Sequence, residues 1–185
     1  MAIEKEYPLH AAAGAEGSRG SALGPQRAGR PVAEGRVSRW LLVVLRLHLG
    51  VILLLTVTGK LTADGPFSEQ LLQFVQRGAG RPGAYGAFLR EVVIPHATLF
   101  SYLVMNGELF AGLSLLLGAV TRLGAGVAMF LFLNYMLAKG RWFWSPDSED
   151  AAVLLSALVV LIGAAGRTLG VDAWFRRRWP SVPLW

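Results

Sequence analysis

Long apolar blocks alternate with short polar connections along the chain. Four of these blocks hold almost no charged residues, and each approaches the roughly 17–25 residues that a helix needs to cross the hydrocarbon core of a bilayer. A helix on the surface of a soluble protein would interrupt such a block with a polar stripe. We therefore predict an all-α membrane protein in which four helices cross the bilayer. The predicted spans are residues 40–58, 96–118, 121–138 and 146–166.

The connections between the blocks predict how the helices are arranged. Residues 119–122 form a link so short that the second and third spans must run antiparallel as a hairpin. The long connection at residues 59–95 contains two segments whose apolar residues keep helical spacing, separated by Arg81-Pro82-Gly83. We expect both segments to be amphipathic helices on the membrane surface, with a packed loop of helical turns as the alternative. The predicted fold class is a four-transmembrane-helix antiparallel bundle with amphipathic surface helices between spans 1 and 2.

Two further segments flank the predicted membrane domain at residues 40–170. Residues 1–39 contain almost no large apolar side chains, so we expect a disordered basic tail there. Residues 171–185 form a basic aromatic tail, which is typical of an anchor at the lipid headgroups. Four spans place both termini on one side, and that side has more Lys and Arg residues than the other. Both termini are therefore predicted to be cytoplasmic.

The composition narrows the chemistry that this chain can perform. It contains no Cys, which excludes disulfides, thiolate nucleophiles, cysteine-ligated iron–sulfur clusters and covalently attached haem made by this chain alone. The formal net charge is +6, and the Arg residues flank the apolar spans instead of forming one continuous stripe. This distribution favours the lipid bilayer as a partner and argues against nucleic acid.

Two charged residues lie deep inside predicted spans, away from the ends, where a charge is unfavourable and is usually paired or functional. Arg46 in the first span and Glu108 in the second have comparable depths when about 1.5 Å is counted for each residue from the cytoplasmic edge. We therefore predict an ion pair between Arg46 and Glu108, which either pins the two helices together or forms part of a functional site. His48, Asn106 and Asn134 complete the candidate intramembrane polar centre, the two Asn residues as hydrogen-bond partners between helices.

One histidine and one acidic cluster remain as candidates for metal or haem ligands. His48 points to a different face of its helix from Arg46, and no second His lies at a matching depth. Asp147, Glu149 and Asp150 cluster at a predicted helix start, where a solvated acidic cap is the simpler interpretation. We predict no metal site.

Several short motifs occur in an order and spacing that resemble the DoxX family of small membrane proteins. They are Leu45-Arg46, Gly59-Lys60-Leu61, Gly107-Glu108 with Gly112, and the segments at residues 116–122 and 163–172. The resemblance covers about residues 37–174. The family also includes the DoxD-type subunits of thiosulfate:quinone oxidoreductase, and the segment Tyr-Gly-Ala-Phe-Leu at residues 85–89 is similar to that branch.

The resemblance implies a four-helix bundle in the inner membrane of a bacterium or archaeon, and a part in membrane redox chemistry. In the best-known members the electron acceptor is a quinone, so Arg46 and His48 are the candidate hydrogen-bond donors to a bound quinone. The family provides no catalytic motif that can be carried over to this chain, and the residues themselves identify no cofactor. Membership therefore implies the fold more directly than a reaction.

Three roles stay open at the level of sequence. The first is an integral membrane subunit of a redox complex with quinone as substrate, which would make the chain one subunit of an enzyme and not a catalyst alone. The second is a non-catalytic membrane anchor or assembly partner for an oxidoreductase, which the absence of redox-active side chains favours. The third is a small-solute transporter, which the buried charges would suit. The expected partner is an oxidoreductase subunit, or further copies of this chain in a homo-oligomer.

Overall fold

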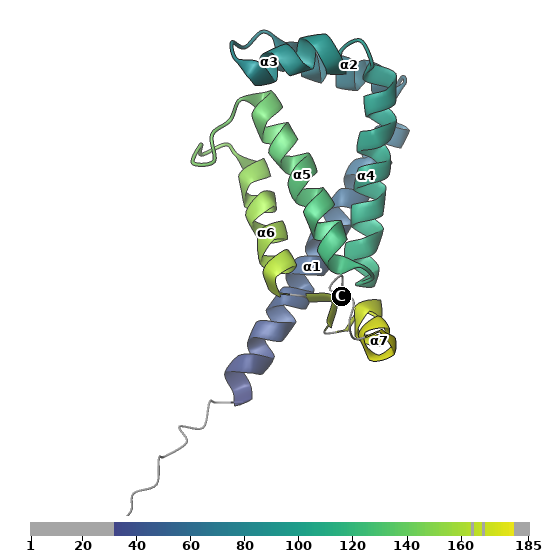
Figure 1. Ribbon diagram of the computed structural model, residues 1–185, viewed down its shortest axis with the longest axis vertical. Coiled ribbons are helices and arrows are strands. Elements are labelled where there is room, and N and C mark those ends of the chain that lie inside the picture. Colours follow the sequence, from purple (N-terminus) through teal and green to yellow (C-terminus); the bar gives the residue numbers. More distant parts are fainter. Residues whose placement is uncertain (1–31, 164, 168, 180–185) are drawn as a thin grey trace, which may run out of the picture. The chain divides into compact units, whose positions relative to one another are not determined.

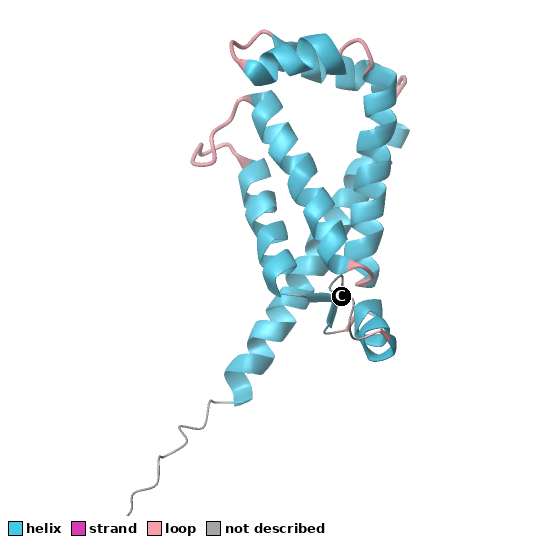
Figure 2. Cartoon of the chain, viewed as in Figure 1, coloured by secondary structure: helices cyan, strands magenta, loops and turns pink. Residues whose placement is uncertain are grey.

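Helices make up all of the regular structure in the described part of the protein (Figure 2). The computed structural model describes residues 32–163, 165–167 and 169–179. Most of the predicted tail at residues 1–39, and the end of the tail at residues 171–185, lie outside this part. In chain order the helices are α1 (Val32–Thr62), α2 (Phe67–Ala79), α3 (Ala84–Phe88), the π-helical η1 (Leu89–Val93), α4 (Ala97–Leu117), α5 (Thr121–Lys139), α6 (Glu149–Gly163), the 3-10 turn η2 (Ala165–Arg167) and α7 (Val171–Arg178).

Within the described residues, three helices are long and apolar enough to cross a bilayer, whereas the sequence predicted four. They are α1 over Ser38–Thr62, α4 and α5. The difference concerns α6, which has 15 residues. Its length is about 22 Å at 1.5 Å per residue, short of a hydrocarbon core of roughly 30 Å. The predicted fourth span began at residue 146, but residues 141–148 form turns and irregular backbone, and the helix starts only at Glu149.

The bounds of α4 and α5 lie within one residue of the predicted spans, whereas α1 is longer than predicted. It begins at Val32 instead of residue 40 and ends at Thr62 instead of residue 58. Between α4 and α5, Gly118 adopts a left-handed conformation with φ of 65°. Glycine reaches this conformation without a steric penalty, so the helix ends sharply and the chain reverses. The predicted hairpin is therefore confirmed.

The bundle helices pack in the order α1, α4, α5 and α6, and α6 also contacts α1 (Figure 1). Helices α1 and α4 approach each other closely. A Cβ atom added at Gly50 of α1 would lie 2.9 Å from the backbone nitrogen of Leu116 and 3.1 Å from the carbonyl oxygen of Gly112. Small residues allow two backbones to come this close. The contact sets the register of the antiparallel pair.

The connection between α1 and α4 forms a helical cap over the end of the bundle where α4 begins and α5 ends (Figure 1). Its core contains Leu71 and Val75 of α2, Leu89 and Val93 of η1, and Ala138 of α5. The two helical segments predicted for this connection both form, and the second continues from α3 into η1. Their apolar side chains pack on one another and on the bundle, and their location at the membrane surface stays a prediction.

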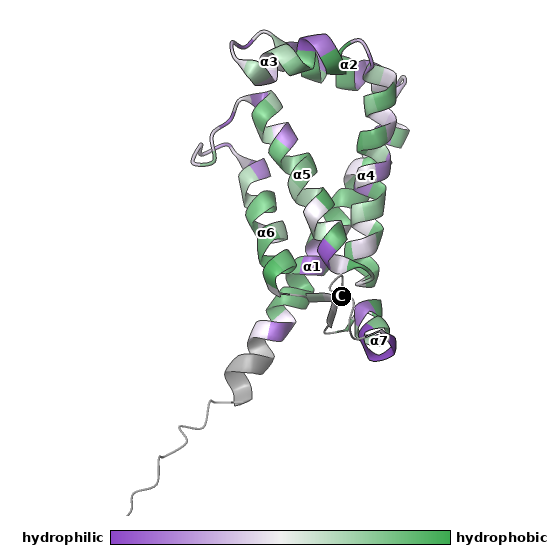
Figure 3. Ribbon diagram, viewed as in Figure 1, coloured by the Kyte–Doolittle hydropathy of each residue, from purple (hydrophilic) through white to green (hydrophobic). Residues whose placement is uncertain are grey.

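Apolar residues dominate the bundle helices, whereas hydrophilic residues gather on α7 and on the connections (Figure 3). Leu55 of α1, Phe130 of α5 and Ile162 of α6 are 63%, 65% and 72% exposed. Large apolar side chains exposed on several helices are unfavourable in water and are expected where helices face lipid tails. The described part of the protein therefore has the surface of a membrane protein.

We predict that Gly50→Ala weakens the bundle, because the new methyl group would force the α1 and α4 backbones apart. Overpacking of this kind costs about 1–3 kcal/mol and should lower the midpoint of thermal unfolding in detergent. Gly59→Ala on the same helix is the control, since nothing lies within 4 Å of a Cβ added there. Equal losses in both variants would show that the close approach is not the cause.

Candidate functional site

Arg46 and Glu108 lie at opposite ends of the α1–α4 contact, so the predicted ion pair between them is wrong. Gly50 of α1 faces Gly112 of α4. Arg46 lies four residues before Gly50, and its guanidinium lies beside Gly118 at the end of α4. Glu108 lies four residues from Gly112 in the other direction. At about 1.5 Å per residue, the two side chains start roughly 12 Å apart along the bundle. The prediction counted depth from the edge of each span, whereas the glycine contact sets the register.

Glu108 is paired with Lys60 and Tyr135, on the side of the bundle that faces the cap. The glutamate is 1% exposed. Its Oε2 forms an ion pair with the Nζ of Lys60, and its Oε1 accepts a hydrogen bond of 2.6 Å from the Tyr135 hydroxyl. The Lys60 ammonium also lies 4.7 Å from the centroid of the Phe67 ring, a cation–π contact. Three helices, α1, α4 and α5, thus meet at one buried carboxylate whose charge is compensated.

A second buried carboxylate lies near the same end of the bundle. Asp150 of α6 is 5% exposed and accepts a hydrogen bond of 2.7 Å from the Nζ of Lys139 at the end of α5. Asp150 therefore differs from the solvated acidic cap predicted for its cluster. Asp147 is solvated as predicted and pairs with Arg141 at 2.6 Å, but it precedes the helix, which starts at Glu149. Across the described ranges, no group of three or more His, Asp or Glu residues is placed to hold a metal ion.

Both lysine–carboxylate pairs line one cavity of about 690 Å³, which we call the bundle cavity. Helices α1, α2, α5 and α6 supply most of its wall, and α4 contributes Glu108. Apart from the two pairs, its lining residues are Ile52, Thr56, Phe67, Gln70, Leu71, Phe74, Phe132, Tyr135, Glu149, Ala152 and Val153. Apolar walls with a few convergent polar groups are typical of ligand sites between the helices of a bundle.

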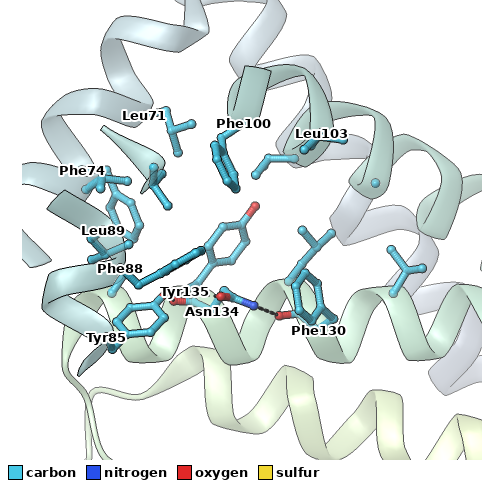
Figure 4. Close-up of a pocket in the computed structure, with 17 residues that line it drawn as sticks. Leu71, Phe74, Tyr85, Phe88, Leu89, Phe100, Leu103, Phe130, Asn134 and Tyr135 are labelled. Atoms are coloured by element: carbon cyan, nitrogen blue, oxygen red, sulfur yellow. Dashed lines mark hydrogen bonds between the residues drawn. The ribbon is translucent and has the colours of Figure 1, made fainter. Parts of the chain in front are cut away.

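The helical cap encloses a second cavity of about 390 Å³, which we call the cap cavity (Figure 4). Its wall comes from α2, α3, η1, α4 and α5. The two cavities share the side chains of Leu71, Phe74 and Tyr135. The two cavities are therefore neighbours, and these shared side chains form a thin partition between them. The charged groups lie on the side of the bundle cavity.

The two candidate Asn residues have different surroundings. Asn134 lines the cap cavity, where its backbone carbonyl oxygen accepts a hydrogen bond of 3.1 Å from the Tyr85 hydroxyl. Its side-chain amide donates to the backbone carbonyl oxygen of Phe130 at 2.7 Å. Burial raises the pKa of Tyr85, so this hydroxyl stays protonated at neutral pH. Asn106 is exposed and donates to the carbonyl oxygen of Tyr102 on its own helix at 2.8 Å. Only Asn134 joins two helices through these bonds.

Arg46 is buried at the opposite end of the bundle. It is 2% exposed, and its guanidinium donates hydrogen bonds to the carbonyl oxygens of Leu169 at 2.8 Å and Ala165 at 3.5 Å. His48 is exposed on α1. Neither of the two cavities is lined by Arg46 or His48. The structure therefore places these two candidates away from the cavities and brings Glu108 and Asn134 to them.

Asp172 lies at the same end of the bundle as Arg46 and caps α5, although it is far from the start of α5 in the sequence. Its carboxylate accepts hydrogen bonds of 2.5 and 2.9 Å from the backbone N–H groups of Val120 and Thr121, 51 residues away from the second of these. Its own backbone N–H donates to the carbonyl oxygen of Gly118 at 2.8 Å, and its charge attracts Arg46. A carboxylate at the first N–H groups of a helix satisfies them and favours the helix dipole.

Sequence reasoning missed the buried contacts of Lys60, Tyr135 and Asp172. Lys60 lies two residues beyond the predicted first span, although its place in the Gly59-Lys60-Leu61 motif is a usable signal. Tyr135 is one hydroxyl in an apolar block, and no local pattern connects it to Glu108. Asp172 lies outside every apolar block, so only the folded chain reveals that it reaches α5.

These features define a class of protein. It is a helical membrane protein with three candidate spans, a helical cap and buried charge pairs beneath that cap. Residues 41–139 match the model of the DoxX family, which is more than half of the chain. The protein belongs to the DoxX family. The matched segment contains Lys60, Glu108 and Tyr135 and ends before α6. Neither a search of curated proteins nor a search of solved structures found a match.

We predict that Glu108→Leu alone destabilises the protein, because it leaves the Lys60 ammonium poorly compensated beside apolar walls. Breaking such a pair costs about 3–5 kcal/mol, whereas removing both charges is often close to neutral. The double variant with Lys60→Met should therefore recover most of the lost stability. Thermal unfolding of the wild type, both single variants and the double variant in lipid nanodiscs measures this coupling. Losses that simply add would contradict the pair.

We also predict that Asp172→Ala loosens the start of α5. Loss of a charged hydrogen-bond acceptor costs about 1–3 kcal/mol, so local opening should become roughly tenfold more frequent. Hydrogen exchange read by mass spectrometry should then accelerate in peptides that contain Val120 and Thr121. Asp147→Ala, at an exposed carboxylate, is the matched control. Unchanged exchange at the start of α5 would show that Asp172 does not cap it.

Proposed function

We propose that this DoxX-family protein is a membrane subunit of a redox complex, that its substrate is a quinone, and that the bundle cavity is the quinone site. The observation that supports this proposal is the composition of that cavity. Among helices suited to a bilayer, it combines two lysine–carboxylate pairs and a tyrosine with aromatic and aliphatic walls. A quinone head is an apolar ring with polar oxygens, so it suits a cavity lined by both apolar and charged side chains.

The chemistry of quinone reduction matches the polar groups of the bundle cavity. The reaction adds two electrons and two protons, and the two ring oxygens accept hydrogen bonds. At one wall of the cavity, the Lys60 ammonium pairs with Glu108 and has further N–H groups to donate, and Tyr135 donates its hydroxyl proton to the same carboxylate. The carboxylates of Glu108 and Asp150 are groups that exchange protons with a bound ligand when they lie within hydrogen-bond reach. We place the electron donor in a partner oxidoreductase subunit, because this chain has no Cys to bind an iron–sulfur cluster.

In this proposal Lys60 takes the donor role that the sequence suggested for Arg46 and His48, and Tyr135 orients Glu108. The guanidinium of Arg46 is occupied by backbone carbonyl groups and lines neither cavity. The imidazole of His48 is exposed and lines neither cavity. Arg46 then holds the closed end of the bundle together, and the ligand binds at the end beneath the cap.

We further propose that α6 completes a four-helix membrane bundle, with both termini on the cytoplasmic side of a bacterial or archaeal inner membrane. The helix contacts α5 and α1. Before it, Trp142 and Trp144 are 82% and 87% exposed, and Trp side chains favour the membrane interface. A bilayer thins around a short apolar helix at modest cost. The excess of Lys and Arg on one side supports the orientation, and the similarity at residues 85–89 supports the DoxD-like branch.

The proposal predicts that Tyr135→Phe weakens the binding of a tailless benzoquinone about three- to tenfold, because the Glu108 carboxylate loses the hydrogen bond that orients it at the cavity wall. Isothermal titration calorimetry of the purified protein in nanodiscs gives the dissociation constant. Tyr102→Phe is the matched control, since Tyr102 is 62% exposed and lines neither cavity.

Equal affinities in the two variants would contradict the site. No binding by the wild type, together with stable co-purification of an oxidoreductase, would support the membrane-anchor role instead.

A further inference from the structure

The cap cavity has the lining of a site for a hydrocarbon chain. Leu71, Val75, Leu89 and Val93 line it, and each is at most 6% exposed. Its Tyr85 hydroxyl and Asn134 side chain are bonded to protein partners. A ligand with polar groups would find these donors and acceptors already engaged, so an apolar ligand fits best.

Part of the cap cavity's lining reaches the lipid-facing surface. Phe88, Leu103 and Phe130 line the cavity and are also 40%, 57% and 65% exposed. They come from α3, α4 and α5, and Figure 4 shows them around the cavity. Because α4 and α5 are candidate membrane spans, an opening bordered by these side chains gives a chain in the bilayer access to the cavity.

The partition between the two cavities separates an apolar space from a charged one. The rings of Phe74 and Tyr135 pack edge to face there, with centroids 6.2 Å apart and an angle of 89° between their planes. The Tyr135 ring lines the cap cavity, while its hydroxyl bonds to Glu108 of the bundle cavity. A molecule with a polar head and an apolar tail would meet matching surroundings on the two sides of this partition.

We infer that the cap cavity binds the hydrocarbon tail of the ligand whose head occupies the bundle cavity, so that the substrate is a lipid-borne, tailed quinone. This inference rests on the proposed function. The tail runs past the Phe74–Tyr135 partition, through the cap cavity, and out between Leu103 and Phe130 into the bilayer. The volume of about 390 Å³, near the lower end of the roughly 300–1,000 Å³ of ligand pockets, suits one chain and not the paired chains of a phospholipid.

The test is photolabelling with a benzoquinone that bears an alkyl tail with a diazirine near its middle. The full chain is reconstituted in nanodiscs, irradiated and digested, and the labelled residues are identified by mass spectrometry. A phosphatidylcholine with the same diazirine reports ordinary lipid contact. We expect the quinone probe to label the buried residues Leu71, Val75, Leu89 and Val93 several-fold more than the lipid probe does.

Two matched variants tie this labelling to the cavity. Val104→Phe adds bulk inside the cap cavity, whereas Val159→Phe makes the same change on the outer face of α6, where Val159 is 47% exposed. We expect Val104→Phe to abolish the excess labelling and Val159→Phe to preserve it. If Val104→Phe fails to fold, Gly107→Ala replaces it, because a Cβ there would meet Leu131 at an ordinary 3.5 Å. This smaller change should reduce the excess.

The outcomes separate the tail site from the proposed function. Label only on outward-facing residues, or label unaffected by the cavity-filling variant, overturns the tail site. The quinone site itself stands in that case if the tailless benzoquinone still binds and still depends on Tyr135. If neither quinone binds the wild type, the proposed function fails and the tail site fails with it.

Discussion

The close approach of α1 and α4 at Gly50 is the constraint on which the rest of the structure depends. A side chain at this position would meet the backbone of α4, so the two helices have one register in which they pack without strain. That register brings Lys60 to Glu108 and sends Arg46 to the far end of α4. A shift by one helical turn, about 5.4 Å, would separate the first pair and leave both charges in an apolar environment.

The two ends of the bundle handle buried charge in different ways. At the Arg46 end, backbone groups provide the partners: two carbonyl groups bind the guanidinium, and the first N–H groups of α5 bind the Asp172 carboxylate. Arg46 and Asp172 line neither of the two cavities. Beneath the cap, lysine ammonium groups pair with the carboxylates of Glu108 and Asp150 beside a cavity. Charges that line open space remain available to a ligand, and this physical difference locates the candidate site.

The helical cap adds a second cavity beside the bundle cavity. An amphipathic segment between two long helices usually packs its apolar face on a neighbouring surface. Here α2 and η1 pack against one another and on α4 and α5 without filling the space between them. The result is an apolar cavity beside a charged one, with Phe74 and Tyr135 as the partition. Under the proposed function, a chain without Cys contributes to membrane redox chemistry by binding the lipid-soluble reactant for a partner.

Sequence alone determined the helical class, the α4–α5 hairpin and the helices of the cap, because apolar blocks, a short link and helical periodicity are local properties of the chain. It also singled out Arg46 and Glu108, since a charge in an apolar block needs no fold to be noticed. Their partners were decided by tertiary structure, because one close glycine contact between helices far apart in sequence sets the register. The same holds for Asp150, which looks solvated in the sequence and becomes buried only when α6 packs beside Lys139. The short α6 was also visible only in the fold, where the turns before Glu149 take residues that the apolar pattern had assigned to a span.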